Sequence, residues 1–206
     1  MKLISLILLT ATLLFSKVYY SKVEPYEIRD ISSNVSGLVL FIDEDMIGKK
    51  LSSKSYIQID SELDLKELKY TKEKLIYLKN TVSSNENVLK NLEKLLVKKR
   101  DNYDKVKSLK IKSTIEKDRE FYDLVSSENT YLNTIKDTNN LKIQISDLNL
   151  RKAQLTRSIS DKNLNAKGFT LYSIAVRAGQ VVGISTPLAK IADISKAKIT
   201  IYLDES

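Results

Sequence analysis

The feature that most constrains this chain is a long stretch without glycine or proline. All five glycines and both prolines lie outside the segment from Lys49 to Lys167. An average globular chain contains about 7% Gly and about 5% Pro, so a gap of this length is unusual. Because Gly and Pro mark most turns, the segment is predicted to form long, uninterrupted helices.

Apolar residues in the first part of this segment recur at heptad spacing. One series is Leu68, Leu75, Val82, Leu89, Leu96 and Tyr103, and its companion is Thr71, Leu78, Asn85, Leu92, Lys99 and Val106. Such a repeat supercoils against a partner helix, and the polar Asn85 and Lys99 lower stability but can fix the register. The helix is expected to start at Ser61, a capping residue followed by carboxylates.

A second periodic stretch runs from about Ile115 to Ile159. Its apolar residues are Phe121, Leu124, Tyr131, Ile135, Leu141, Ile145, Leu148 and Leu155, with one phase shift expected near Asn139 and Asn140. We expect the two stretches to fold back on each other as an antiparallel hairpin that turns between Lys105 and Thr114. The alternative is an intermolecular coiled coil with a continuous helix through residues 105–115.

The segments on either side of this insert carry short β-branched runs and tight turns, which are typical of strands. They also match each other: a glycine (Gly37; Gly168) precedes a strand and a polar turn, and a further strand ends at Asp60 or Asp193. Neither half of about thirty residues could bury a core alone. The two halves are therefore expected to meet in one small β-domain.

The N-terminus has the pattern of a secretory signal peptide. Lys2 precedes an apolar run from Leu3 to Phe15 that ends at Ser16. The run is shorter than the about 20 residues needed to cross a bilayer. Residues 1–16 are predicted to be removed near Ser16; the alternative is an uncleaved anchor extended through Tyr20.

Composition excludes several kinds of chemistry. The chain has no His and no Cys, so it can have no Ser-His-Asp or Cys-His nucleophile, no His/Cys zinc site and no disulfide. No catalytic residue, cofactor site or metal site is predicted, and the protein is not expected to be an enzyme. The net charge is +8, but the helical segment mixes both signs as a solvated surface does, and no nucleic-acid partner is expected.

The combination of these parts resembles one family, the membrane fusion proteins or periplasmic adaptors of the haemolysin-D-like type. The matching residues are Gly37-Leu-Val39 with Asp45-Met-Ile47, then Gly179-Gln-Val-Val182 with Ser185-Thr-Pro187-Leu188. Glu44, Lys50 and Ser185 stand where that family usually has glycine, which is tolerated if these turns avoid positive φ.

The resemblance implies an α+β fold: a biotinyl/lipoyl-like β-sandwich split by a long antiparallel coiled-coil hairpin, with only the start of a β-barrel domain. The implied divisions are residues 26–60 and 168–196 for the two halves of the lipoyl-like domain, 61–165 for the hairpin and 197–206 for the truncated barrel strand.

The resemblance also implies a function. Adaptors of this family link an inner-membrane transporter to an outer-membrane duct of the TolC type, for efflux or type I secretion, and assemble as rings of identical copies. The expected location is the periplasm, in association with the inner membrane. The alternative is a periplasmic coiled-coil scaffold unconnected to transport, whose flanks would not form one sandwich.

Family adaptors that use this duct carry an Arg, a Leu four residues later and a Ser seven further, near the hairpin tip. Lys105, Leu109 and Glu116 occupy these spacings here, and the resemblance makes them candidate partner-binding residues. Lys lacks the bidentate fork of Arg, and Glu is not a conservative exchange for Ser. The alternative is that Leu109 is an ordinary seam residue and the other two are solvated charges.

Overall fold

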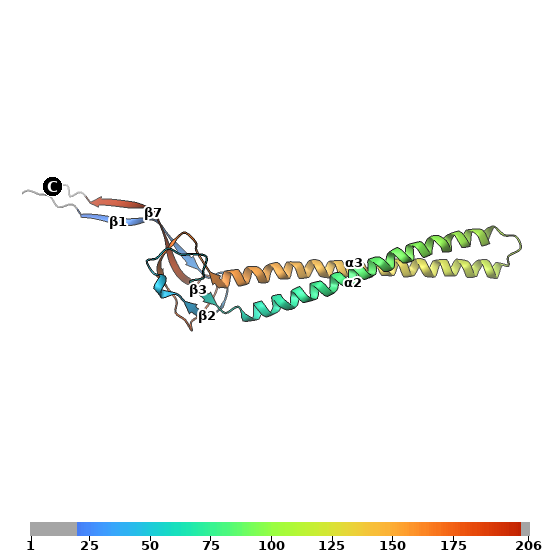
Figure 1. The fold of residues 1–206 in the computed structure, drawn as a ribbon, viewed down its shortest axis with the longest axis horizontal. Helices are drawn as coiled ribbons and strands as arrows, with labels where there is room; N and C mark the ends of the chain where they lie inside the picture. The colour runs from blue at the N-terminus through green and yellow to red at the C-terminus, as the bar shows by residue number, and fades with distance from the viewer. Residues whose placement is uncertain (1–19, 203–206) are drawn as a thin grey trace, which may run out of the picture. The chain divides into compact units, whose positions relative to one another are not determined.

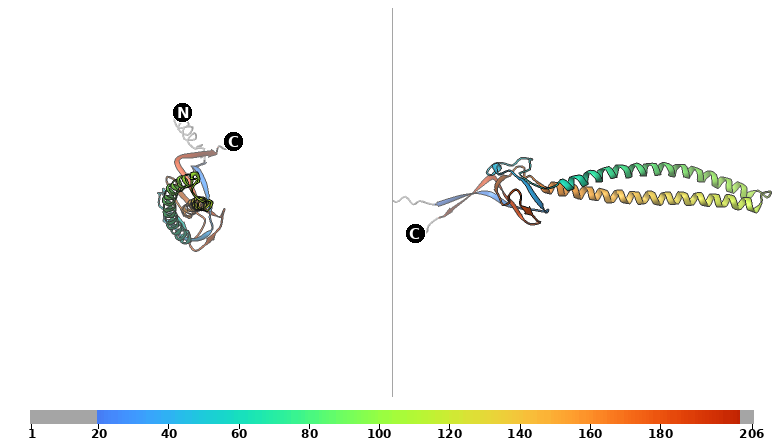
Figure 2. Two further views of the ribbon diagram at one scale, coloured as in Figure 1. Left: turned by 90° about the vertical axis from the view of Figure 1, so that its right-hand side faces the viewer. Right: turned by 90° about the horizontal axis from the view of Figure 1, so that it is seen from below.

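The computed structural model describes residues 20–202, so the predicted signal peptide lies outside the described residues. The chain divides into two compact units. One combines the residues up to Asp60 with those from Asp161 onward, and the other is Ser61–Ser160. We call them the sheet unit and the helical unit, and Figure 1 and Figure 2 show the elements of each.

The sheet unit contains two antiparallel sheets. The first has the order β1 (Tyr20–Ser32), β7 (Pro187–Tyr202), β5 (Thr170–Ile174). The second has the order β4 (Asn163–Leu164), β3 (Ile57–Ile59), β2 (Gly37–Ile42), β6 (Val181–Val182). A short 3-10 turn, η2 (Glu44–Met46), follows β2. Each sheet therefore contains strands from both ends of the chain.

One hydrophobic core serves both sheets. Val39 and Ile57 from the second sheet are fully buried, as are Leu171 and Leu188 from the first. A buried aliphatic side chain of this size stabilises a fold by about 1.5–3 kcal/mol. Because residues from both flanks make up this core, each flank depends on the other to exclude water.

The chain leaves and re-enters the sheet unit on neighbouring strands. β3 pairs with β4, so that Ile57 lies opposite Leu164 and Gln58 opposite Asn163. The helical unit begins just after β3 and ends just before β4. Whatever lies between must therefore return to its starting point.

β1 and β7 are longer than the sequence indicated. β1 begins at Tyr20 rather than near Tyr26, and its first residues pair with the end of β7, from Tyr20 opposite Tyr202 to Pro25 opposite Ala197. Pro25 lacks an N–H but is tolerated because β1 is an edge strand, and the register shifts directly after it. Residues 197–202 are thus a continuation of β7.

Ser185 corrects one expectation about the turns. Its φ is 68°, in the left-handed region where glycine is favoured, whereas Glu44 and Lys50 avoid positive φ. The conformation is held by neighbouring contacts: the Ser185 N–H donates to the Ser33 carbonyl at 2.8 Å, and the Thr186 N–H closes the turn onto the Gly183 carbonyl at 3.1 Å.

The helical unit is an antiparallel hairpin of α2 (Glu62–Ser108) and α3 (Thr114–Lys162). Three ion pairs link the two helices, and they show that the helices run antiparallel, because the residue number on α3 falls as that on α2 rises. They are Glu67 with Arg151 at 2.6 Å, Glu86 with Lys142 at 2.9 Å and Lys99 with Asp123 at 2.6 Å. The predicted hairpin is confirmed, and a continuous helix through residues 105–115 is wrong. No helix among residues 20–202 combines the length and apolarity that crossing a membrane requires.

The heptad seam predicted for α2 is confirmed. Between Leu68 and Val106, every residue that is buried or half-buried belongs to the two predicted series, and every other residue is exposed. The polar seam residue Lys99 is held by its ion pair with Asp123. Ser61 is the N-cap as expected, but its side chain makes no capping hydrogen bond.

The phase shift predicted for α3 is wrong. The buried and half-buried residues continue at steps of three and four through Tyr131, Thr134, Thr138 and Leu141 without interruption. Residues with small hydroxyl side chains occupy the seam positions that lack an apolar residue. The Thr138 hydroxyl donates to the carbonyl of Thr134 at 2.7 Å, one helical turn back, so it can be buried without an unsatisfied donor.

We predict that Gly37→Ala destabilises the sheet unit by roughly 1–3 kcal/mol, because the new Cβ would lie 2.7 Å from Cγ2 of the buried, β-branched Ile59. Gly183→Ala is the matched control, since its Cβ meets nothing nearer than 4.0 Å. Hydrogen exchange by mass spectrometry on peptides from β2 and β3 measures the change. Equal protection in both variants would contradict the close packing at Gly37.

We also predict that Thr138→Asp destabilises the hairpin by roughly 2 kcal/mol, because it places a charge at a seam position that is 3% exposed. Asn139→Asp, at the adjacent exposed position, should leave stability nearly unchanged. Thermal unfolding followed by far-UV circular dichroism compares them. A larger loss of stability for Asn139→Asp than for Thr138→Asp would contradict the continuous seam and support the phase shift predicted from the sequence.

Candidate functional site: the hairpin tip

The tip is the five-residue loop from Leu109 to Ser113 that joins α2 to α3. α2 ends at Ser108 because Leu109 adopts an extended conformation, and the Ser108 hydroxyl donates to the Lys105 carbonyl at 2.8 Å. The candidate residues Lys105, Leu109 and Glu116 lie before, in and after this loop.

Lys105 lies in the last turn of α2, where a positive charge interacts favourably with the helix dipole. Its ammonium group pairs with Asp101 at 2.5 Å, and its side chain remains 69% exposed. Leu109 is outside the seam and 43% exposed, so the alternative that it is an ordinary seam residue is wrong.

Glu116 belongs to a capping box at the start of α3. Its carboxylate accepts hydrogen bonds from the Ser113 N–H at 3.0 Å and the Ser113 hydroxyl at 3.2 Å, and the Glu116 N–H donates back to that hydroxyl at 3.3 Å. Lys112 donates to the same carboxylate at 3.0 Å. The pKa of Glu116 is lowered, first by Lys112 and then by the two bonds from Ser113. Glu116 therefore has a structural role.

Two exposed residues of the tip were missed by the sequence reasoning. Ile111 is 89% exposed and Ile115 is 80% exposed. The periodic stretch was expected to start near Ile115, but the first half-buried residue of α3 is Lys117, so Ile115 lies outside the seam, and Ile111 lies in the loop. From Lys105 through Ile115 the sequence also holds four lysines and no acidic residue, so the apex is apolar and basic.

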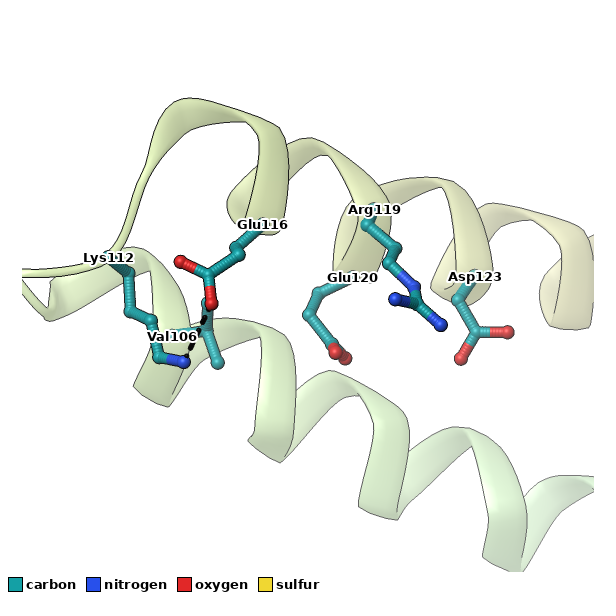
Figure 3. A pocket seen from close by; sticks show the side chains of 6 residues that line it. All are labelled: Val106, Lys112, Glu116, Arg119, Glu120 and Asp123. Carbon is teal, nitrogen blue, oxygen red and sulfur yellow. Dashed lines mark hydrogen bonds and ion pairs between the residues drawn. The ribbon is translucent and has the colours of Figure 1, made fainter.

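A polar cavity of ≈ 380 Å³ lies just below the loop (Figure 3). Its lining residues are Val106, Lys112, Glu116, Arg119, Glu120 and Asp123. Glu116 is paired with Lys112 and Asp123 with Lys99, so both carboxylates already have a partner. Within residues 20–202, no cluster of acidic side chains is arranged to hold a metal ion.

Solved structures with a similar fold were found by comparison. MacA from Actinobacillus actinomycetemcomitans matches with a TM-score of 0.63 and 18% identity, over 88% of this chain and 54% of MacA. The periplasmic adaptor protein EmrA matches with a TM-score of 0.52 and 15% identity, over 91% of this chain and 79% of EmrA. This chain has the fold of the periplasmic adaptors.

The adaptor fold agrees with the predicted resemblance to membrane fusion proteins. The chain spans about half the length of the MacA structure, 54%. No protein-family model and no curated protein matches its sequence.

We predict that Ser113→Ala raises the pKa of Glu116 toward its ordinary value, because it removes one of the hydroxyl and backbone contacts that favour the carboxylate. A lowered pKa stabilises the folded state above the ordinary pKa, and this is lost as the pH falls. The first turn of α3 should therefore fray in acid, and in Ser113→Ala it should fray at a higher pH than in the wild type. Carboxyl NMR titration measures the pKa; an unchanged value would contradict the capping box. Ser126→Ala, also exposed on α3, is the control.

Proposed function

We propose that this protein is a periplasmic adaptor, or membrane fusion subunit, that links an inner-membrane transporter to a TolC-type outer-membrane duct in efflux or type I secretion. The observation that carries the proposal is the insertion of an antiparallel hairpin between two flanks that share one core. The similarity to EmrA extends over 91% of this chain. A scaffold role without transport would not require the flanks to meet.

In this proposal the sheet unit corresponds to the biotinyl/lipoyl-like sandwich, and the end of β7 leads into a β-barrel. The protein would be exported by its N-terminal signal, remain associated with the inner membrane and assemble as a ring. Its role would be mechanical rather than enzymatic. At 1.5 Å per residue, helices of 47 and 49 residues reach about 70 Å, which suits a part that spans an aqueous gap.

The proposed docking surface is the hairpin tip, with Lys105 and Leu109 as contact residues. Both side chains are accessible, and the Lys105 ammonium group pairs with Asp101. Glu116 would contribute by shaping the start of α3 through its contacts with Ser113. A residue that holds the loop in place can be required for docking without touching the partner.

The test is capture of membrane partners by the tagged, full-length protein. The double variant Lys105→Gln/Leu109→Ser should bind the outer-membrane duct roughly tenfold more weakly, a loss of about 1.4 kcal/mol, because it removes a charge and an apolar contact. Capture of the inner-membrane transporter should be unchanged.

The matched control is Lys136→Gln/Leu132→Ser, which alters an exposed lysine and an exposed leucine (58%) in the middle of α3. It should bind the duct as the wild type does. Full duct binding by the tip variant would remove Lys105 and Leu109 from the docking surface. Capture of neither a transporter nor a duct by the wild-type protein would contradict the adaptor function.

A further inference from the structure

The end of the hairpin carries the two most exposed large apolar side chains of residues 20–202. They are Ile111, in the loop, at 89% and Ile115, in the first turn of α3, at 80%. Leu109, at the start of the loop, is also exposed. A single exposed apolar residue needs no explanation, but these three lie within one short stretch and none of them lines the cavity below the loop. We call Leu109, Ile111 and Ile115 the apex cluster.

Lysines surround the apex cluster, and no acidic residue lies among them. The four are Lys105, Lys107, Lys110 and Lys112. The first and the last each pair with a carboxylate four residues away along the chain. Lys107 lies over the uncharged ring of Tyr103, and Lys110 pairs with no carboxylate within residues 20–202. Two positive charges of the apex are therefore not neutralised by the protein itself.

The loop that presents the cluster is held by its own hydrogen bonds. At its end, the Ser113 N–H donates to the Glu116 carboxylate at 3.0 Å, and Lys112 pairs with the same carboxylate at 3.0 Å. At its start, the Leu109 N–H donates to the Val106 carbonyl at 3.2 Å. A loop that is fixed before binding loses less conformational entropy when it binds. The apex cluster is thus exposed on a preformed support.

We propose that the apex binds the surface of an anionic lipid bilayer. Ile111 and Ile115 would insert at the boundary between headgroups and acyl chains, with the lysines among the headgroups. Apolar side chains combined with lysines are the pattern of elements that lie in this interface. Each lysine near such a surface strengthens binding roughly fivefold, because anionic lipids create a negative surface potential. The inference does not rest on the proposed function.

The composition of the apex favours a bilayer over a protein as the partner of the cluster. The cores of protein interfaces are enriched in Tyr, Trp and Arg and depleted in Lys. Residues 105–115 contain no aromatic residue and no arginine. Lysine has a long apolar stem and a compact, strongly hydrated charge, so the stem can cover apolar surface while the ammonium group stays among lipid phosphates.

The absence of cysteine from the sequence allows a fluorophore to be placed at the apex alone. The full chain with Ile111→Cys is labelled with the environment-sensitive dye NBD and mixed with vesicles of phosphatidylglycerol and phosphatidylcholine. We expect a blue shift of the emission, and quenching by nitroxide groups on the lipid acyl chains. Both effects should be absent with pure phosphatidylcholine and should be lost at high salt.

The matched label position is Tyr122→Cys. Tyr122 is also apolar and 69% exposed, but it lies on α3 beyond the basic stretch, so its label should stay in water. Because the dye reports only its own surroundings, a vesicle bound by another part of the chain, such as the apolar run 3–15, gives no signal at the apex.

Charge variants test the role of the lysines. Added to the labelled Ile111→Cys chain, Lys107→Gln/Lys110→Gln should raise the lipid concentration for half of the shift roughly 25-fold, fivefold for each lysine. Lys94→Gln/Lys98→Gln removes the same charge from exposed positions further from the loop on α2 and should leave this concentration unchanged. Circular dichroism checks that each variant retains its helices.

No shift at Ile111 with anionic vesicles would overturn the proposal, as would an equal shift with pure phosphatidylcholine or at Tyr122. A label shielded before vesicles are added would overturn it too, because protein would then cover the apex. Weaker duct capture by Ile111→Ser, without lipid insertion, would make the apex a protein-docking surface instead. Insertion without capture of a transporter or a duct would refute the adaptor function alone, whereas capture without insertion would refute this inference alone.

Discussion

Pairing between strands from opposite ends of the chain is the constraint on which the rest of the structure depends. β1 pairs with β7 along most of its length, and β3 pairs with β4 at the two ends of the insert. The flanks bury their apolar residues in one core, and neither could do so alone. A helical insert that starts and ends on paired strands can only be closed by a turn near its middle.

Within the hairpin, side chains are buried only along a narrow seam between the two helices, and this seam stabilises the hairpin as a core stabilises a compact domain. The seam accepts polar residues where each has a partner: Lys99 pairs with Asp123, and the Ser127 hydroxyl donates to the Asp123 carbonyl at 2.9 Å. Such a seam leaves most of both helices in solvent, including large apolar side chains such as Tyr77 and Leu150. A long, stiff arm with exposed sides is suited to contact with other proteins, as the proposed function requires.

The sequence predicted most of what periodicity can encode. The α2 seam was found because leucines occupy it, as at Leu75 and Leu89, whereas the α3 seam was misread because Thr138 is not recognised as a core residue until its hydroxyl is seen to be satisfied within the helix. At the tip, the pattern Ser113-x-x-Glu116 is a visible capping box, but a comparison by family spacing assigned Glu116 to a partner. Pairing of Tyr20 with Tyr202 is non-local and left no sequence signal.

The most direct test is the distance between nitroxide labels on the variants Lys69→Cys and Asn149→Cys combined in one chain, measured by pulsed electron paramagnetic resonance. Both positions are exposed, and the labelled protein is diluted with unlabelled protein so that only distances within one copy are observed. A hairpin predicts a short distance, set by helix axes about 8–10 Å apart. A continuous helix would separate the labels by ~120 Å, and the absence of the short distance would contradict the fold.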